Sequence, residues 1–253
     1  MMEILKSVQE VRAWRSRVAG SCGFVPTMGA LHLGHESLIR RASDTCDASV
    51  VSIFVNPTQF NDPSDFEAYP VTLDADLEKS EAAGANAVFI PDENEIYADG
   101  RSFKLSESVV SREMEGRERP GHFDGVLTVV MKLLNIVNPT HAFFGEKDYQ
   151  QFLLIERMAK AFFLECEIVP CATVREADGL AFSSRNRRLT DGGRKRAPDL
   201  HHQLSTAGNA AEASRALKAA GFSVEYIEEH WGRRFGAVQL DGVRLIDNLE
   251  ILR

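Results

Sequence analysis

Two histidines three residues apart stand out in residues 27–35, whose sequence is TMGALHLGH. Imidazoles such as those of His32 and His35 can donate hydrogen bonds to phosphate oxygens, where negative charge grows during phosphoryl or nucleotidyl transfer. Gly34, between them, allows a ligand to approach the backbone closely. Two surface histidines in an ordinary loop would look the same, but this pair follows an apolar run directly. That position predicts a phosphate-binding turn between a strand and a helix.

Two more polar segments follow apolar runs in the same way. Residues 56–60, NPTQF, contain Gln59, whose amide can both donate to and accept from a small hydroxy acid. Residues 145–151, GEKDYQQ, contain Lys147, a compact charge for a phosphate, and Asp148, which could accept from ribose hydroxyls. Taken alone, the first is also typical of a strand-to-loop turn, and the second of a solvated loop with a helix cap.

A fourth segment, SSRN at residues 183–186, offers two hydroxyls and a guanidinium. Such a set can clamp a polyphosphate and stabilise a pyrophosphate leaving group. It also fits a serine cap before an arginine-rich helix. Just upstream, residues 174–180 predict the end of a strand and a tight turn.

The elements that would position these segments alternate between strand and helix patterns. We expect strands at residues 23–26, 49–55, 87–90, 141–144 and 167–170, and helices at residues 35–42, 73–83, 126–137 and 149–161. Such alternation predicts a Rossmann-like α/β fold with a parallel sheet. Ligands bind at the carboxyl ends of the strands in such sheets, so the four polar segments would converge on one site.

The pattern changes after about residue 174. Residues 191–220 are rich in Ala, Arg and Lys and predict helices, with breaks at Pro198 and Gly208. Short strands are expected at residues 223–227, 235–240 and 243–246. The chain is therefore predicted to divide into a sheet domain, residues 1–173, and a smaller α+β domain, residues 174–253.

Composition excludes several classes of protein. The 253 residues carry a net charge of −8 without a long Lys/Arg run, which argues against a nucleic-acid partner. No 18-residue apolar run is present, so no membrane span is expected, and residues 1–14 lack the apolar stretch of a signal peptide. None of the four cysteines forms a C-x-x-C pair, which favours buried free thiols in a cytoplasmic protein.

Six segments of the chain resemble the pantothenate synthetase (pantoate–β-alanine ligase) family. They are VPTMGALHLGH, VVSIFVNPTQF, RPGHFDGVLTVVMKLLNIVNP, FFGEKDYQQ, VREADGLAFSSRNRRL and RLIDN, in the family's order. The resemblance implies that ATP and pantoate give pantoyl adenylate and pyrophosphate, and that β-alanine then yields pantothenate and AMP. It also implies Mg²⁺ with ATP, a homodimer, only small-molecule substrates, and a C-terminal domain that acts as a lid.

The resemblance also assigns residues to roles. The catalytic residues would be His35 as proton donor, His32, Lys147 and Arg185, while pantoate and β-alanine would contact Gln59 and Gln151. The ATP-binding residues would be Met28, Gly29, Ala30, Leu31, His32, Leu33, Gly34, His35, Gly145, Glu146, Lys147, Asp148, Val174, Phe182, Ser183, Ser184 and Arg185. It assigns no metal ligands.

This sequence departs from the family pattern at three places. Leu33 stands where Glu is frequent, Phe182 replaces the usual Met, and the C-terminal domain is shorter than the family norm. Two alternatives remain: another acid-activating adenylyltransferase of the same superfamily, and a nucleotide-binding regulatory module without catalysis.

Overall fold

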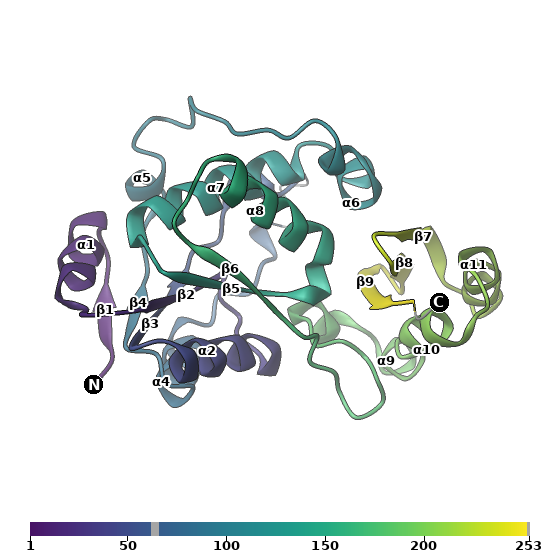
Figure 1. Cartoon of the computed structure of the whole chain (residues 1–253). Helices are drawn as coiled ribbons and strands as arrows, with labels where there is room; N and C mark the ends of the chain where they lie inside the picture. The colour runs from purple at the N-terminus through teal and green to yellow at the C-terminus, as the bar shows by residue number, and fades with distance from the viewer. Residues whose placement is uncertain (62–65, 252–253) are drawn as a thin grey trace. The chain divides into compact units, whose positions relative to one another are not determined.

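The computed structural model describes residues 1–61 and 66–251. The chain forms two compact units, each built from two pieces of the sequence (Figure 1). The first unit consists of Met1–Gly145 and Gln150–Cys171, and the second of Glu146–Tyr149 and Ala172–Arg253. The short piece Glu146–Tyr149 thus belongs, by its contacts, with the C-terminal part of the chain.

The first unit is built around a parallel sheet, as predicted. Within the described residues the sheet has six strands in the order β1-β4-β3-β2-β5-β6. Their bounds are β1 Glu3–Leu5, β2 Cys22–Thr27, β3 Ala48–Ile53, β4 Ala87–Phe89, β5 His141–Gly145 and β6 Glu167–Cys171. Every pairing is parallel. Sequence patterns found every strand except β1, which has three residues and lies at the sheet edge.

The strand order places the direction change of the chain between β2 and β5. From β2 the chain proceeds through β3 and β4, and it then returns to the other side of β2 to form β5 and β6. The crevice outside the carboxyl ends of two such neighbours is the usual ligand site of an open α/β sheet. The predicted segments at residues 27–35 and 145–151 begin at these two strand ends.

Helices cover both faces of this sheet (Figure 1). On one face lie α2, Leu33–Thr45, and α4, Leu73–Ala82; on the other lie α7, His122–Val137, and α8, Tyr149–Ala161. Further helices of this unit are α1 Val8–Arg17, α5 Glu93–Ile96 and α6 Met114–Glu118, with short 3-10 turns η1 Pro57–Gln59 and η2 Val110–Arg112. Burial of β-branched strand side chains against α2, with Val25, Val51 and Ile39 fully buried, stabilises this packing.

The second unit is an antiparallel sheet covered by helices, again as predicted. Its elements are η3 Glu146–Asp148, η4 Ser184–Arg188, α9 Asp191–Arg196, α10 Asp199–Thr206, α11 Ala210–Ala219, β7 Ser223–His230, β8 Arg233–Leu240 and β9 Val243–Glu250. Pro198 is the N-cap of α10 and Gly208 lies between α10 and α11, so both predicted breaks are confirmed. Both hairpins turn through two residues with positive φ, the second residue being Gly232 or Gly242.

The cysteines carry free thiols, as expected. Cys22, Cys46 and Cys171 are buried, whereas Cys166 is partly exposed. Burial raises the pKa of Cys22 to about 11 and that of Cys166 to about 12. Both thiols therefore stay protonated at neutral pH, which makes them poor nucleophiles.

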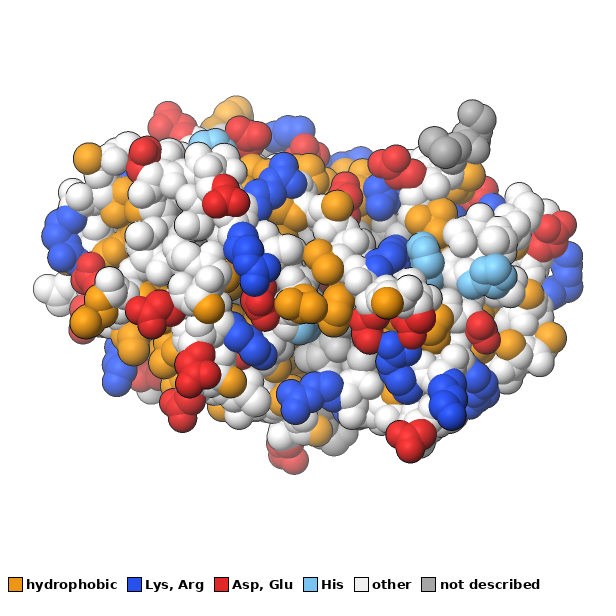
Figure 2. All heavy atoms as spheres, turned by 90° about the horizontal axis from the view of Figure 1, so that it is seen from below, with side chains coloured by type: hydrophobic (Ala, Val, Ile, Leu, Met, Phe, Trp, Pro, Cys, Tyr) orange, Lys and Arg blue, Asp and Glu red, His pale blue; other side chains and the backbone are white. Residues whose placement is uncertain are grey.

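Acidic and basic side chains are interspersed on the face drawn in Figure 2. That face lacks the broad field of one sign that binding to a phosphate backbone requires. In residues 1–61 and 66–251, no helix is long and apolar enough to cross a membrane.

Candidate active site

The histidine loop, which we define as residues 28–35, runs from the end of β2 into the first turn of α2. His32 is the N-cap of α2, and its Nδ1 accepts a hydrogen bond from the Gly34 amide at 3.2 Å. An amide must donate, so Nδ1 carries the lone pair and the ring proton is on Nε2. The rings of His32 and His35 stack with centroids 4.1 Å apart. The two rings therefore lie together at a helix N-terminus, a position that favours phosphate.

A buried carboxylate holds the backbone of this loop. Gly29 and Ala30 have φ of 79° and 49°, which turns the chain sharply after β2. Asp76 on α4, only 1% exposed, accepts hydrogen bonds from the amides of Ala30 at 2.9 Å and Leu31 at 2.7 Å. Lys79, one turn further along α4, donates to the Leu31 carbonyl at 2.5 Å. The local sequence pattern gave no sign of this role for Asp76.

The turn at residues 57–59 lies beside the histidine loop. The Gln59 amide nitrogen lies 2.9 Å from the Met28 sulfur, and Asn56 donates to the Gln59 side-chain oxygen at 3.1 Å. Asn56 is only 1% exposed, and it also accepts from the Tyr97 hydroxyl at 2.7 Å. The structure thus brings together the predicted nucleotide loop and the predicted acid-binding glutamine.

The segment RPGHFDG, at residues 119–125, fixes the same turn from the opposite side. His122 Nδ1 donates to the Gln59 carbonyl at 2.8 Å, and Arg119 donates to it at 3.3 Å. At Gly125, an added Cβ would lie 2.4 Å from the Thr58 carbonyl oxygen, so only glycine allows α7 to approach this closely. This motif, which had no assigned role, therefore holds Gln59 in place.

Two adjacent glutamines at the start of α8 are in different environments. Gln150 is 3% exposed, and its amide donates to the carbonyls of Val110 and Glu113 and accepts from the Glu115 amide. It therefore has a structural role. Gln151, the predicted substrate residue, is only partly buried.

The second unit contains the predicted adenine and phosphate residues. The Phe182 amide donates to the Val174 carbonyl at 3.1 Å, which closes a short hairpin with Gly179 at φ 92°. The tight turn predicted at residues 174–180 is thus confirmed. Ser183 caps η4, its hydroxyl accepting from the Arg185 amide at 3.3 Å. Val174 and the phosphate segment 182–185 are therefore held in one piece of structure.

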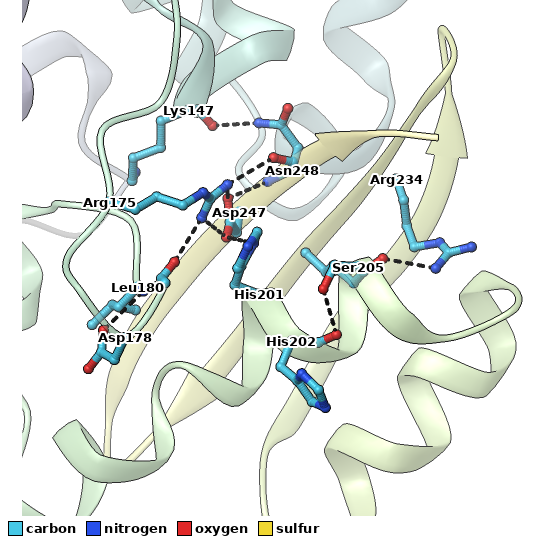
Figure 3. A network of polar contacts seen from close by, with 12 residues as sticks. Lys147, Arg175, Asp178, Leu180, His201, His202, Ser205, Arg234, Asp247 and Asn248 are labelled. Carbon is cyan, nitrogen blue, oxygen red and sulfur yellow. Dashed lines mark hydrogen bonds and ion pairs between the residues drawn. The ribbon is translucent and has the colours of Figure 1, made fainter. Parts of the chain in front are cut away.

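The lysine loop, which we define as Glu146–Tyr149, follows β5 directly and is fixed by β9. The Asn248 amide donates to the carbonyl of Glu146 at 2.9 Å and to that of Lys147 at 2.8 Å. Figure 3 shows the second of these bonds. The Lys147 ammonium lies 3.7 Å from the Asp148 carboxylate. Both η3 and η4 contact β9, so the segments of Lys147 and Arg185 share one supporting strand.

A buried ion pair lies next to this clamp on β9. Arg175 binds the Asp247 carboxylate through both terminal nitrogens, at 2.6 and 3.0 Å, and His201 Nδ1 lies 3.4 Å from it (Figure 3). Burial alone would raise the pKa of Asp247, but its interactions with His201 and Arg175 outweigh burial and lower the pKa. Asp247 is therefore a stable anion at neutral pH.

An all-parallel sheet with polar turns at its switch point, joined to a small antiparallel unit, defines a Rossmann-like α/β protein of the nucleotidyltransferase type. The sequence profile described as pantoate-beta-alanine ligase matches residues 3–250. The chain belongs to the pantoate–β-alanine ligase family.

Individual relatives agree with this assignment. A pantothenate synthetase of Bdellovibrio bacteriovorus is 53% identical over 251 residues, covering 99% of this chain and 100% of that protein. The two proteins are thus nearly equal in length. A crystal structure of pantoate-beta-alanine ligase from Francisella tularensis, complexed with beta-gamma ATP and beta-alanine, has a TM-score of 0.93 at 39% identity, covering 99% of this chain and 98% of that one. Pantothenate synthetase from Thermus thermophilus has a TM-score of 0.90 at 38% identity, covering 98% and 99%.

Proposed function

We propose that this protein condenses pantoate with β-alanine to form pantothenate, using ATP and proceeding through pantoyl adenylate. The observation that carries the proposal is the stacked pair His32 and His35 at the N-terminus of α2, in a loop whose Met28 contacts Gln59. One loop thus carries groups suited to phosphate and contacts an amide suited to a hydroxy acid. The assignment is also supported by membership of the pantoate–β-alanine ligase family.

In the first step, a pantoate carboxylate oxygen attacks the α-phosphorus of ATP. The new O–P bond forms as the bond to the bridging oxygen breaks, and pyrophosphate leaves with that electron pair. His32 would donate from Nε2 to a phosphate oxygen, because its Nδ1 is already occupied by the Gly34 amide. His35, Lys147 and Arg185 would stabilise the remaining negative charge, His35 as a proton donor.

In the second step, the β-alanine amine attacks the acyl carbon of the adenylate. The C–N bond forms, the acyl–oxygen bond breaks, AMP leaves, and the amine loses a proton to solvent or to a nearby base. Gln59 and Gln151 would orient the pantoyl group, and the fixed position of Gln59 supports that role. An ordered acyl group is needed, since the adenylate otherwise reacts with water.

The nucleotide would bind along both predicted sets of residues. Residues 28–35 and Gly145 lie in the first unit, whereas residues 146–148, Val174 and residues 182–185 lie in the second. The second unit would act as a lid. We further propose Mg²⁺ as the counter-ion of the ATP phosphates, because this ion commonly keeps water and substrate phosphate ligands. A cytoplasmic homodimer is proposed from the family resemblance.

The deciding experiment measures AMP formation from ATP and pantoate, with and without β-alanine. We expect AMP and pantothenate in equal amounts, and pyrophosphate release that depends on pantoate. If other carboxylic acids support faster pyrophosphate release, the protein is instead another acid-activating adenylyltransferase. ATP binding without any turnover would indicate a regulatory module and would contradict the proposal.

A further inference from the structure

The lysine loop is attached to the first unit by covalent bonds at both ends but is held by contacts of the second unit. Gly145 ends β5 and Gln150 continues α8, and both belong to the first unit. The carbonyls of Glu146 and Lys147, by contrast, are bound by Asn248 on β9. Those two bonds connect residues more than a hundred positions apart in sequence.

Asn248 is itself fixed, so it can act as a rigid clamp. Its side chain is 2% exposed, and its Oδ1 accepts from Arg233 Nε at 2.7 Å, which determines the orientation of the amide. Both amide hydrogens then point at the two carbonyls of the lysine loop. In Figure 3 the Lys147 side chain extends away from Asn248, so the clamp binds the backbone and leaves the ammonium for a ligand.

Arg233 adds two more contacts to the same loop. Its guanidinium lies over the Tyr149 ring, 4.4 Å from the centroid, and 3.8 Å from the Glu146 carboxylate. Tyr149 also packs against Phe235 on β8, with ring centroids 6.1 Å apart. The loop is therefore held at both ends and in its middle by two neighbouring strands of the second unit.

We propose that Asn248 is a positioning residue for Lys147, and that its clamp makes Lys147 and the Arg185 segment a single phosphate-binding half-site supported by β9. This rests on the proposed function, in which both residues bind the ATP phosphates. Any displacement of the second unit would carry both cations together. The RLIDN motif at residues 244–248 thereby gains a role: Asn248 holds the loop, and Asp247 anchors Arg175 beside it.

The test is the substitution Asn248→Asp. It keeps the oxygen that accepts from Arg233 but replaces the side-chain nitrogen with a second oxygen, which cannot donate to the carbonyls of Glu146 and Lys147. Without substrates, hydrogen exchange in peptides spanning residues 146–149 should rise. The kcat/KM for ATP should fall by about 30- to 100-fold, as expected for a displaced catalytic group. The KM for pantoate should stay within about twofold of wild type. The matched control is Asn94→Asp, at an exposed position in the first turn of α5, where a carboxylate is tolerated and nothing should change.

A double-mutant cycle separates positioning from general stability. If Asn248 acts through Lys147, adding Asn248→Asp to Lys147→Ala should lower kcat/KM for ATP by no more than about twofold further. Asn248→Ser, which retains one donor, should give an intermediate effect and serves if the first variant does not fold. An undiminished loss in the Lys147→Ala background would overturn the proposal.

Hydrogen exchange also gives a result that does not depend on the reaction. Unchanged exchange at residues 146–149 in folded Asn248→Asp would refute the clamp, whatever the enzyme does. If the wild-type protein makes no pantothenate, the proposed function fails, while the exchange data still decide whether Asn248 holds the loop. Faster exchange with unaltered kcat/KM for ATP would refute the positioning role.

Discussion

The histidine loop and the lysine loop are held by buried polar side chains of opposite hydrogen-bonding character. The histidine loop presents amide groups to the carboxylate of Asp76, which is a pure acceptor. The lysine loop presents carbonyl groups to the side-chain amide of Asn248, which donates to both. In each case one residue, at most 2% exposed, satisfies two backbone groups that would otherwise remain unpaired.

The two supports differ in where they come from. Asp76 and the histidine loop belong to the same unit. The lysine loop follows β5, which is in the first unit, but the loop itself belongs with Asn248 to the second unit. The shape of the histidine loop therefore depends on the first unit alone. The shape of the lysine loop depends on the folding of β9, and this dependence links Lys147, which we propose binds phosphate, to the second unit.

The largest effect is expected for His35→Ala in the histidine loop. Loss of one preorganised donor at the transferring phosphate should cost roughly 3–4 kcal/mol of transition-state stabilisation, with the fold intact. The rate of pyrophosphate release would measure catalysis, and circular dichroism would show whether the variant is folded. His202→Ala, at an exposed histidine on α10, is the control and should retain full activity. Near wild-type turnover in folded His35→Ala would rule out its catalytic role.

The substitutions Lys147→Ala and Arg185→Ala test whether these two residues of the second unit act together or independently in adenylation. Each change should lower adenylation kcat/KM by about 100-fold, because each removes a cation that we propose binds the polyphosphate. Groups that act together are non-additive, so the double variant should lose less than the sum, with a coupling of about 0.5–3 kcal/mol. Fully additive losses would show that sharing β9 does not couple the two residues.

Asp76→Asn should loosen the histidine loop without affecting the lysine loop. The new amide can accept from only one of the two backbone amides, and the other is left unpaired. We expect a loss of about 1–3 kcal/mol in the free energy of unfolding, with faster hydrogen exchange at residues 28–35. Asp74→Asn, at an exposed position on the same helix, should change neither quantity. Equal loosening of residues 146–149 would contradict the independence of the two supports.

The smallest effect is expected when the pH is lowered, which should reduce the stability of the second unit. Folding lowers the pKa of Asp247 from its ordinary value near 4. At pH values between the folded and the unfolded pKa, the unfolded chain therefore binds more protons than the folded chain. Its stabilisation is therefore complete above about pH 4 and is lost as the pH falls toward the folded pKa, at about 1.4 kcal/mol per unit of depression. Hydrogen exchange at residues 146–149 should therefore lose protection as the pH is lowered from 5, when the exchange rate is compared with that of an unfolded peptide at the same pH.

Asp247→Asn supplies the control for the acid experiment. The variant should be less stable at neutral pH because Arg175 loses its charged partner. It should also show no acid-dependent loss of protection, because the titrating group is gone. A loss of protection of equal size in the variant would assign the acid effect to another carboxylate.

Much of the fold could be predicted because β-branched runs and helical periodicity are local signals. The strands at residues 49–55 and 141–144 were found within two residues of their true ends. Helix starts were less accurate. The predicted helix at residues 126–137 begins four residues earlier, at His122, because His122 and Asp124 interrupt the apolar pattern there. The predicted start at residue 35 is in fact at Leu33, since His32 is an uncommon N-cap.

The site was only partly predictable, for a physical reason. Residue type and a position after a strand mark the groups that could contact a ligand, so His32, Gln59 and Lys147 could be selected. The residues that hold these loops lie far along the chain. Asp76 is 45 positions from Leu31, whose amide it binds, and Asn248 is 101 positions from Lys147. Their contacts form only when the fold brings distant segments together, and no local pattern records them.

The distance between Lys147 and Asn248 along the chain also sets an order of assembly during synthesis. At about 5–20 residues per second, roughly 5–20 s pass between the addition of Lys147 and that of its clamp. The interval between the addition of Leu31 in the histidine loop and that of Asp76 is less than half as long. During synthesis, Asp76 is therefore available to the histidine loop before Asn248 has been added, and the carbonyls of the lysine loop are hydrogen-bonded to water in that interval. The two halves of the site would thus mature one after the other.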